Sequence, residues 1–426
     1  PFCLAGLPTD RSEKMKTLFG LWTDFVKKTS ATLLMKKTPL FTLLLTIFID
    51  IVGFSIIIPI LPVYSKEIGA SNIMVGIIAG SYSLMNFLFS PVWGNISDRI
   101  GRKPVILVSL FITACSYLLF AYSKTISLLL ISRIIAGIGS ANYGAAQAYI
   151  SDITKPEDRA RAFGYVGAAF GLGFIIGPVI GVFILKMWNV AAIGYVTMAL
   201  NLANMLMAMA ILHETRKEVK SGTPLLENPI INVRDGLKTP VLGKLMFISL
   251  LYITALSMMQ ITISVFWSEK YGLSKTQISG MFAFMGIMSV LVQGFLVGKL
   301  TLKFGEKNMM IIGAVLLAAG LYIIPMAPYK EGFYLVEGFA IILISLANGC
   351  LSPSITSLLS QNAGAEEQGK VLGVGMSVNS LGRVIGPYAG GFLYGMAMFM
   401  PYFIGTLIMI GAWNVARRFR TKYAHI

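Results

Sequence analysis

The chain contains 426 residues, of which 56% are hydrophobic and only 13% are charged, and its mean hydropathy is +0.75. A soluble protein carries about a quarter charged residues, so this composition excludes a soluble globular domain. The formal net charge of +16 is compatible with a nucleic-acid partner or with an asymmetric membrane topology, and the positions of the basic residues decide between the two.

Apolar runs of about twenty residues recur from residue 39 to residue 416, and each is long enough to cross a hydrocarbon core about 30 Å thick. The shorter alternating segments typical of a membrane β-barrel are not seen. We therefore predict an all-α polytopic membrane protein with twelve transmembrane helices. In chain order, the predicted spans cover residues 39–61, 73–94, 104–122, 127–150, 162–185, 190–212, 241–267, 276–298, 308–328, 332–359, 370–395 and 399–416.

The basic residues are distributed unequally between the two sides of this topology. With both termini on one side, that side holds 27 Lys and Arg residues and the opposite side holds six. Cytoplasmic loops carry the excess of Lys and Arg, so we predict an inner-membrane protein with both termini in the cytoplasm. The positive charge therefore reflects topology, and we expect no nucleic-acid partner.

An internal repeat divides the chain into two halves. "GNISDRIGRKPVI" begins at residue 94 and "GKLTLKFGEKNMM" at residue 298, an offset of 204 residues. Residues 156–181 and 365–390 align at an offset of 209, and both contain an Ile-Gly-Pro motif near their ends. The duplication predicts a substrate site between the halves and alternating access to it.

The repeat also predicts the domain organisation. We expect two pseudo-symmetric six-helix bundles, with a cytoplasmic segment before the first bundle that contains an amphipathic helix, "LFGLWTDFVKK", on the membrane surface. The predicted units are residues 1–38 (N-terminal segment), 39–212 (first bundle), 213–240 (cytoplasmic linker), 241–416 (second bundle) and 417–426 (tail).

Four stretches in order resemble the major facilitator superfamily, and most closely the tetracycline-efflux branch of its bacterial drug:proton antiporters. They are "DIVGFSIIIPILP", "GNISDRIGRKP", "LISRIIAGIGSANYGAAQAYISDIT" and "GLGFIIGPVIG". The resemblance covers about residues 40 to 415 and implies the major facilitator fold. It also implies secondary transport that is driven by a proton gradient, without a bound cofactor.

Among the charged residues inside predicted spans, we single out Asp50, Arg133 and Arg383. A charge at bilayer depth is costly and usually marks an ion or substrate path. The resemblance places Arg133 near Asp50, so we interpret Asp50 as the proton acceptor and Arg133 as its electrostatic partner. Arg383 either pairs with Asp50 or binds an anionic substrate. The alternatives are an Asp50 at the membrane edge, a static ion pair, and an Arg383 that extends to the interface.

Two further motifs carry expectations from the resemblance. In the loop after the second span, Asp98 would face the start of span eleven and Arg102 would anchor it, which closes a cytoplasmic gate. The predicted gate comprises Gly94, which would let two helices approach closely, and Asp98, Arg99, Gly101, Arg102 and Lys103. The predicted antiporter motif comprises Gly173, Gly177, Pro178 and Gly181. The alternatives are a merely topogenic basic loop and generic glycine packing.

The pattern departs from the tetracycline pumps in spans eight and nine, where those pumps carry ionisable residues. The matching stretches here contain no Asp, Glu or His, so we expect no coupling through such groups and hold tetracycline as one substrate among several classes. Other polar and aromatic residues in the spans are candidates for the cavity wall: Asn86, Asn142, Gln147, Phe170, Phe174, Gln260, Gln293 and Asn379.

The sequence favours a secondary transporter that exports a small amphipathic or lipophilic compound in exchange for protons. The alternatives are a transporter of an anionic metabolite, siderophore or lipid with Arg383 as the anion anchor, and a non-transporting receptor. No zinc-protease motif, P-loop or soluble domain is seen, so we expect no enzyme, no catalytic residue and no metal site. We expect a monomer that contacts membrane lipid, protons and a small-molecule substrate.

Overall fold

The computed structural model describes residues 39–154, 159–215, 234, 236–237, 240–329, 331–363 and 368–419. The predicted amphipathic helix before residue 39 and most of the predicted linker therefore lie outside the described residues. So do the side chains of residues 159–161, 163–164 and 368–370.

The described residues are helical and contain no strand. The helices are α2 (Pro39–Ile57), α3 (Leu61–Glu67), α4 (Asn72–Ile100), α5 (Arg102–Tyr122), α6 (Ile126–Gly139), η1 (Ser140–Asn142), α7 (Tyr143–Ile153), α8 (Arg159–Met187), α9 (Val190–Ile211), α11 (Leu242–Tyr271), α12 (Lys275–Leu291), η3 (Val292–Val297), α13 (Gly298–Ile323), η4 (Ile324–Met326), α14 (Phe333–Gln361), α15 (Gln368–Met396) and α16 (Met400–Arg417).

Each of the twelve predicted spans is mainly helical, with a turn after α2 in the first and η1 between α6 and α7 in the fourth. Nine helical stretches of the described chain are long and apolar enough to cross a membrane. One of the nine, Lys275–Met326, contains 52 residues and includes two predicted spans. Gly305 separates them, because its backbone has φ +74° and ψ 156°, which no helix adopts. α15 and α16 are not among the nine, so their crossing of the membrane remains a prediction.

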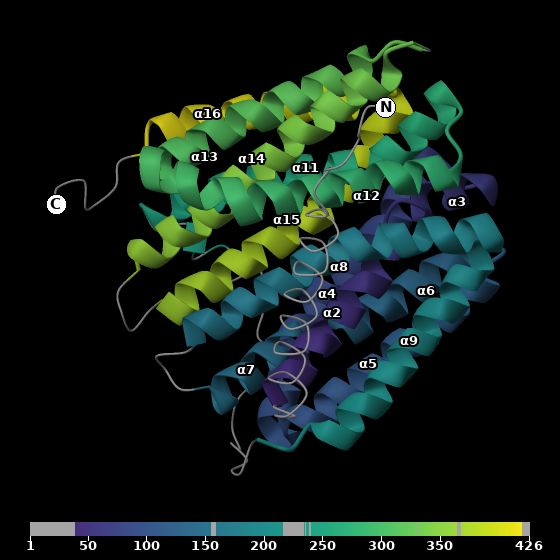
Figure 1. Cartoon of the computed structure of the whole chain (residues 1–426), viewed down its shortest axis with the longest axis vertical. Helices are drawn as coiled ribbons and strands as arrows, with labels where there is room; N and C mark the ends of the chain where they lie inside the picture. The colour runs from purple at the N-terminus through teal and green to yellow at the C-terminus, as the bar shows by residue number, and fades with distance from the viewer. Residues whose placement is uncertain are drawn as a thin grey trace, which may run out of the picture.

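The helices form two groups, α2–α9 and α11–α16, which lie side by side in Figure 1. Within the first group α2 packs on α8, and α5 on α9; within the second α11 packs on α15, and α13 on α16. Between the groups α4 packs on α15 and α8 packs on α12. The same helix contacts thus recur in both groups, as a duplication requires.

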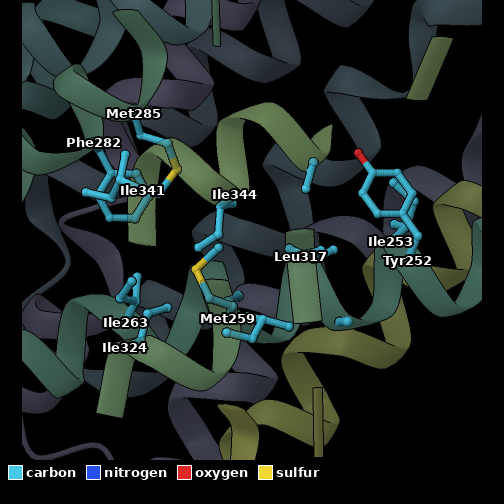
Figure 2. Close-up of a cluster of buried hydrophobic side chains, with 14 of the residues drawn as sticks. Tyr252, Ile253, Met259, Ile263, Phe282, Met285, Leu317, Ile324, Ile341 and Ile344 are labelled. Carbon is cyan, nitrogen blue, oxygen red and sulfur yellow. The ribbon is translucent and has the colours of Figure 1, made fainter. Parts of the chain in front are cut away.

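The interior of the second group is densely packed with aliphatic, methionine and aromatic side chains from α11, α12, α13 and α14 (Figure 2). Because lipid tails are as apolar as leucine, such helices associate through close van der Waals packing more than through a hydrophobic driving force. Close packing holds each group together as a unit.

Glycines bring the two groups into backbone contact. A Cβ atom at Gly76 of α4 would lie 2.4 Å from the carbonyl oxygen of Pro387, and one at Gly391 of α15 would lie 2.6 Å from that of Asn72. Gly80 is covered in the same way by the ring of Tyr388. These positions lie near the start of α4 and the end of α15, on the side that the charge distribution predicts to be extracellular, which we call the predicted outer side.

Candidate functional site

Asp50 is a half-buried carboxylate in the transmembrane helix α2. Its Oδ1 atom is buried and has no hydrogen-bond partner in the described structure. The neighbour that hydrogen-bonds the carboxyl group is Asn142, which η1 brings there by interrupting the fourth predicted span with a short 3-10 turn. Asn142 in turn donates a hydrogen bond from Nδ2 to Ser109 Oγ. The site thus combines an incompletely satisfied acid with a polar support.

Arg133 of α6 is buried, with only 2% of its surface exposed, but it forms no ion pair with Asp50. The alternative of a static Asp50–Arg133 ion pair is therefore not found, and the role of Arg133 as an electrostatic partner of Asp50 stays a prediction. The guanidinium lies 5.1 Å from the ring centre of Phe120 and 5.9 Å from that of Tyr117, while Nε donates to Ser132 Oγ at 3.3 Å. Two aromatic faces compensate part of the cost of burying the cation.

Tyr82 of α4 interacts electrostatically with all three of the charged residues singled out from the sequence. It lies within electrostatic range of Asp50, Arg133 and Arg383, and its ring stacks on Phe54 with centroids 4.7 Å apart and an interplanar angle of 23°. The three charges singled out from the sequence therefore all act on Tyr82, although no ion pair joins Asp50 to either arginine.

Arg383 lies on α15 in the second group, and its side chain is exposed. It lies within electrostatic range of Tyr82 and Tyr143 from the first group and of Tyr252 from its own group. No ion pair in the described chain joins it to Asp50. The guanidinium is thus exposed at mid-helix and lies within electrostatic range of tyrosines from both halves.

Several candidate cavity residues connect helices. Asn379 of α15 accepts a hydrogen bond from Ser249 Oγ of α11 at 2.6 Å, within one half. Gln147 of α7 approaches Met376 of α15, with Nε2 3.7 Å from Sδ, and so joins the two halves.

The two aromatic candidates pack edge-on against neighbouring rings, Phe170 on Tyr143 and Phe174 on Phe54. Asn86 and Gln260 are half-buried. Gln293 is exposed in the π-helical segment η3, beside Gly349 of α14.

The predicted cytoplasmic gate is centred on Arg102, which is 8% exposed. Its Nη1 atom contacts Asp98 Oδ1 at 2.8 Å and its Nε contacts Asp152 Oδ2 at 3.3 Å. Asp152 also accepts a hydrogen bond from Thr215 Oγ1 at 3.1 Å. These contacts join α4, α5, α7 and the segment that follows α9. The predicted contact of Asp98 with the start of span eleven involves side chains outside the described residues.

Glu214 caps the N-terminus of α5. Its carboxylate oxygens accept hydrogen bonds from the backbone N–H groups of Arg102, at 2.9 Å, and Lys103, at 3.1 Å. An acidic group at a helix N-terminus also interacts favourably with the helix dipole. Gly101, with φ +104°, permits this approach, because a Cβ there would lie 2.4 Å from Glu214 Oε2. The role of Gly101 is therefore to admit the cap.

The predicted glycine positions on α4 and α8 differ in how closely a neighbouring helix approaches them. A Cβ at Gly94 would meet nothing within 4 Å, so the predicted close helix approach at this residue is wrong. On α8, Gly173 and Gly177 pack directly against α2: a Cβ would lie 2.6 Å from Ile51 at the first and 1.8 Å from Ser55 Oγ at the second. Gly181 makes only ordinary contact, at 3.6 Å, and Pro178 lies within the same helix.

Two ion pairs bridge the halves on the predicted outer side. Lys66 of α3 contacts Glu269 of α11 at 3.2 Å, and Glu67 of α3 contacts Lys275 of α12 at 2.7 Å. Glu269 also accepts a hydrogen bond from Tyr394 Oη at 2.9 Å. Each half therefore supplies one acid and one base, and we call these the outer ion pairs. They link the two halves on the predicted outer side.

Comparison with known proteins identifies the family. The profile of the Major Facilitator Superfamily matches residues 43–387 and 245–423. The chain belongs to the Major Facilitator Superfamily. It is 32% identical over 352 residues to tetracycline resistance protein class C of Escherichia coli, which covers 82% of this chain and 87% of the relative. It is 31% identical over 382 residues to multidrug resistance protein 2 of Bacillus subtilis (strain 168), covering 88% and 93%.

Solved structures agree on the fold. The human organic anion transporter MFSD10 (TETRAN) matches with a TM-score of 0.67 and 22% identity, covering 88% of this chain and 98% of that one. A peptide transporter POT variant matches with a TM-score of 0.73 and 15% identity, covering 89% and 94%. The protein is thus a multi-pass inner-membrane transporter for small molecules, homologous to tetracycline and multidrug efflux proteins, and not an enzyme.

For this superfamily member, sequence reasoning missed several polar residues. Asp152 and Glu214 were overlooked because their partner, Arg102, lies 50 and 112 residues away. Lys66 and Lys275 were counted only as loop charges, and Glu67 and Glu269 were not considered. A search for opposite charges at equivalent ends of the two halves would have found them.

The outer ion pairs predict a charge-swap result. Because the four side chains are partly exposed, each pair should stabilise the closed side by about 1 kcal/mol or less. We expect Glu67→Lys to shift the halves toward the outer-open state, measured as labelling of a cysteine placed between them. Adding Lys275→Glu should restore the wild-type labelling rate. A double variant that labels as fast as the single one would contradict the role of this pair.

Proposed function

We propose that the protein exports a small amphipathic or lipophilic compound in exchange for protons, with Asp50 as the protonation site. The observation that carries this proposal is the buried, unpartnered Oδ1 atom of Asp50 inside a transmembrane helix. Intramembrane carboxylates of this kind usually lie on ion paths. The tetracycline and multidrug resistance relatives support the drug class.

The electrostatics around Tyr82 supply a coupling step. Ionised Asp50 offsets part of the positive potential that Arg133 and Arg383 create around this ring. Protonation removes the negative charge, so the surroundings become one unit more positive. A substrate that contacts the ionised carboxylate of Asp50 loses this interaction on protonation, so a proton and such a substrate compete for Asp50.

Alternating access requires a closure on each side. The outer ion pairs close the predicted outer side, and the cluster around Arg102 is the proposed cytoplasmic closure. We propose that both termini are cytoplasmic and that a monomer is sufficient, with the proton gradient as the energy source and no bound cofactor. The test is efflux from proteoliposomes under an imposed pH gradient, which should stop when a protonophore is added.

Arg383 favours a second candidate, export of an anionic compound. Its exposed guanidinium is faced by tyrosines of both halves and has no acid paired with it in the described chain. We expect Arg383→Glu to alter export of neutral or cationic drugs only mildly if the first candidate is correct. If the protein exports an anion, the same substitution should abolish efflux of that anion in the same proteoliposome assay.

A further inference from the structure

A second buried acid lies in the half of the protein opposite Asp50. Glu337 is in the second turn of α14, its side chain is 0% exposed, and neither carboxylate oxygen has a hydrogen-bond partner in the described structure. Burial of an ionised carboxylate without partners is strongly unfavourable. The geometry therefore requires either a proton on Glu337 or a cation that moves to it.

The surroundings of Glu337 supply hydrogen-bonding groups that are themselves unused. The indole Nε1 of Trp267 on α11 and the phenol Oη of Tyr402 on α16 are also buried without a partner. Trp267 lies close enough to the Glu337 carboxyl group for a weak interaction that falls short of normal hydrogen-bond geometry, and Tyr402 interacts with the group electrostatically. Such unpaired donors and acceptors around one acid indicate a site that is complete only in another protonation or conformational state.

One cation lies close enough to act on this acid. Lys270 interacts electrostatically with Glu337 but forms no ion pair with it among the described residues. Its ammonium instead donates to the carbonyl oxygen of Pro325 at 3.0 Å. It also lies 4.8 Å, 5.1 Å and 5.4 Å from the ring centres of Tyr271, Phe266 and Phe399. Aromatic faces hold a cation without neutralising it, so Lys270 remains free to pair with an acid.

The other groups that face Glu337 do not carry charge at neutral pH. Tyr271 of α11 and Tyr402 of α16 interact with it electrostatically. The described parts of α12 and α13, which also pack on α14, contribute no charged group that acts on it. Lys270 is therefore the cation to which Glu337 responds.

The position of Lys270 links this acid to the outer closure. Lys270 follows Glu269 directly in the chain, and Glu269 forms one of the outer ion pairs with Lys66. When that pair separates, the end of α11 that carries both residues is released from the first half.

We propose that Glu337 is a proton-binding site that controls closure of the predicted outer side. In the closed state Glu337 carries a proton and Lys270 stays on the aromatic rings. In the open state the carboxyl O–H bond breaks, the proton leaves to water, and the Lys270 ammonium pairs with the resulting carboxylate. Protons bind the closed state more tightly, so acidification of the outer side favours closure. This mechanism operates with or without the proposed role of Asp50.

Infrared spectroscopy of the purified protein tests the protonation directly. We expect a carbonyl band of a protonated carboxylic acid that is lost in Glu337→Gln and retained in Glu67→Gln, which removes an exposed acid. The band should also persist in Asp50→Asn, so failure of the proposed transport mechanism does not affect the result. Persistence of an unchanged band in Glu337→Gln would overturn the proposal.

Distance measurements test the link to closure. Spin labels at Lys124→Cys and Glu331→Cys, both exposed on the predicted outer side of opposite halves, report its opening. We expect the distance to increase as pH rises in the wild type and to stay short at every pH in Glu337→Gln. Lys270→Gln, at a half-buried helix end, should likewise lose the pH-dependent opening. An unchanged pH response in either variant would refute the link.

Discussion

Replacement Asp50→Asn is expected to abolish efflux driven by a proton gradient while the protein remains folded. The amide has the shape of the carboxyl group but binds no proton in this pH range. Because Oδ1 has no hydrogen-bond partner to lose, the substitution removes the titratable group at little structural cost. The measurement is substrate efflux from proteoliposomes with an imposed pH gradient, and the rate should fall to that of empty liposomes.

Two controls separate loss of coupling from loss of the protein. Asp50→Glu keeps a titratable carboxyl group and should retain gradient-dependent efflux, although the longer side chain would slow it. Exchange of labelled for unlabelled substrate, which needs no proton movement, should continue in Asp50→Asn. Efflux that still follows the pH gradient in Asp50→Asn would remove this residue from the mechanism.

The second large effect concerns the contact between α2 and α8. In Gly177→Ala, the new Cβ would lie 1.8 Å from Ser55 Oγ and 2.8 Å from the Val52 carbonyl oxygen, so the helices must separate. Ser55 Oγ donates to the Gly173 carbonyl oxygen at 2.8 Å, and this interhelical hydrogen bond would be lost. Overpacking of this kind costs about 1–3 kcal/mol. We expect a lower Tm and reduced transport, measured on detergent-purified protein and in proteoliposomes.

The matched control lies on the same helix. A Cβ at Gly167 would meet nothing within 4 Å, and alanine is a better helix former than glycine by about 0.5–1 kcal/mol. Gly167→Ala should therefore leave the Tm unchanged or raise it. If both alanine variants had the same Tm, close packing at Gly177 would not contribute to the stability of the protein.

Features that depend on local composition could be predicted from the sequence. Each predicted span is mainly helical because a run of apolar residues is required to cross a bilayer whatever its neighbours are. The close packing at Gly173 and Gly177 also follows from local composition, because small residues on one face of a membrane helix allow a second helix to approach closely.

Features that depend on the tertiary arrangement could not be predicted in this way. The sequence indicated that Arg133 needs a partner, but two aromatic rings on α5, rather than the acid on α2, cover its guanidinium. Glu337 was visible as an acid inside a predicted span. Glu337 was not predicted as a site, because the groups near its carboxyl come from α11 and α16 and only the tertiary packing brings them together.

The contact between Gly76 and Gly391 has a mechanical consequence. Side chains in an interface can accommodate movement by changing rotamer. At Gly76 and Gly391 the backbones of two helices are in direct contact, so no side chain is available to adjust. Any movement at this point must displace an entire helix. For the proposed alternating access, we therefore infer that the two halves would pivot about the crossing of α4 and α15.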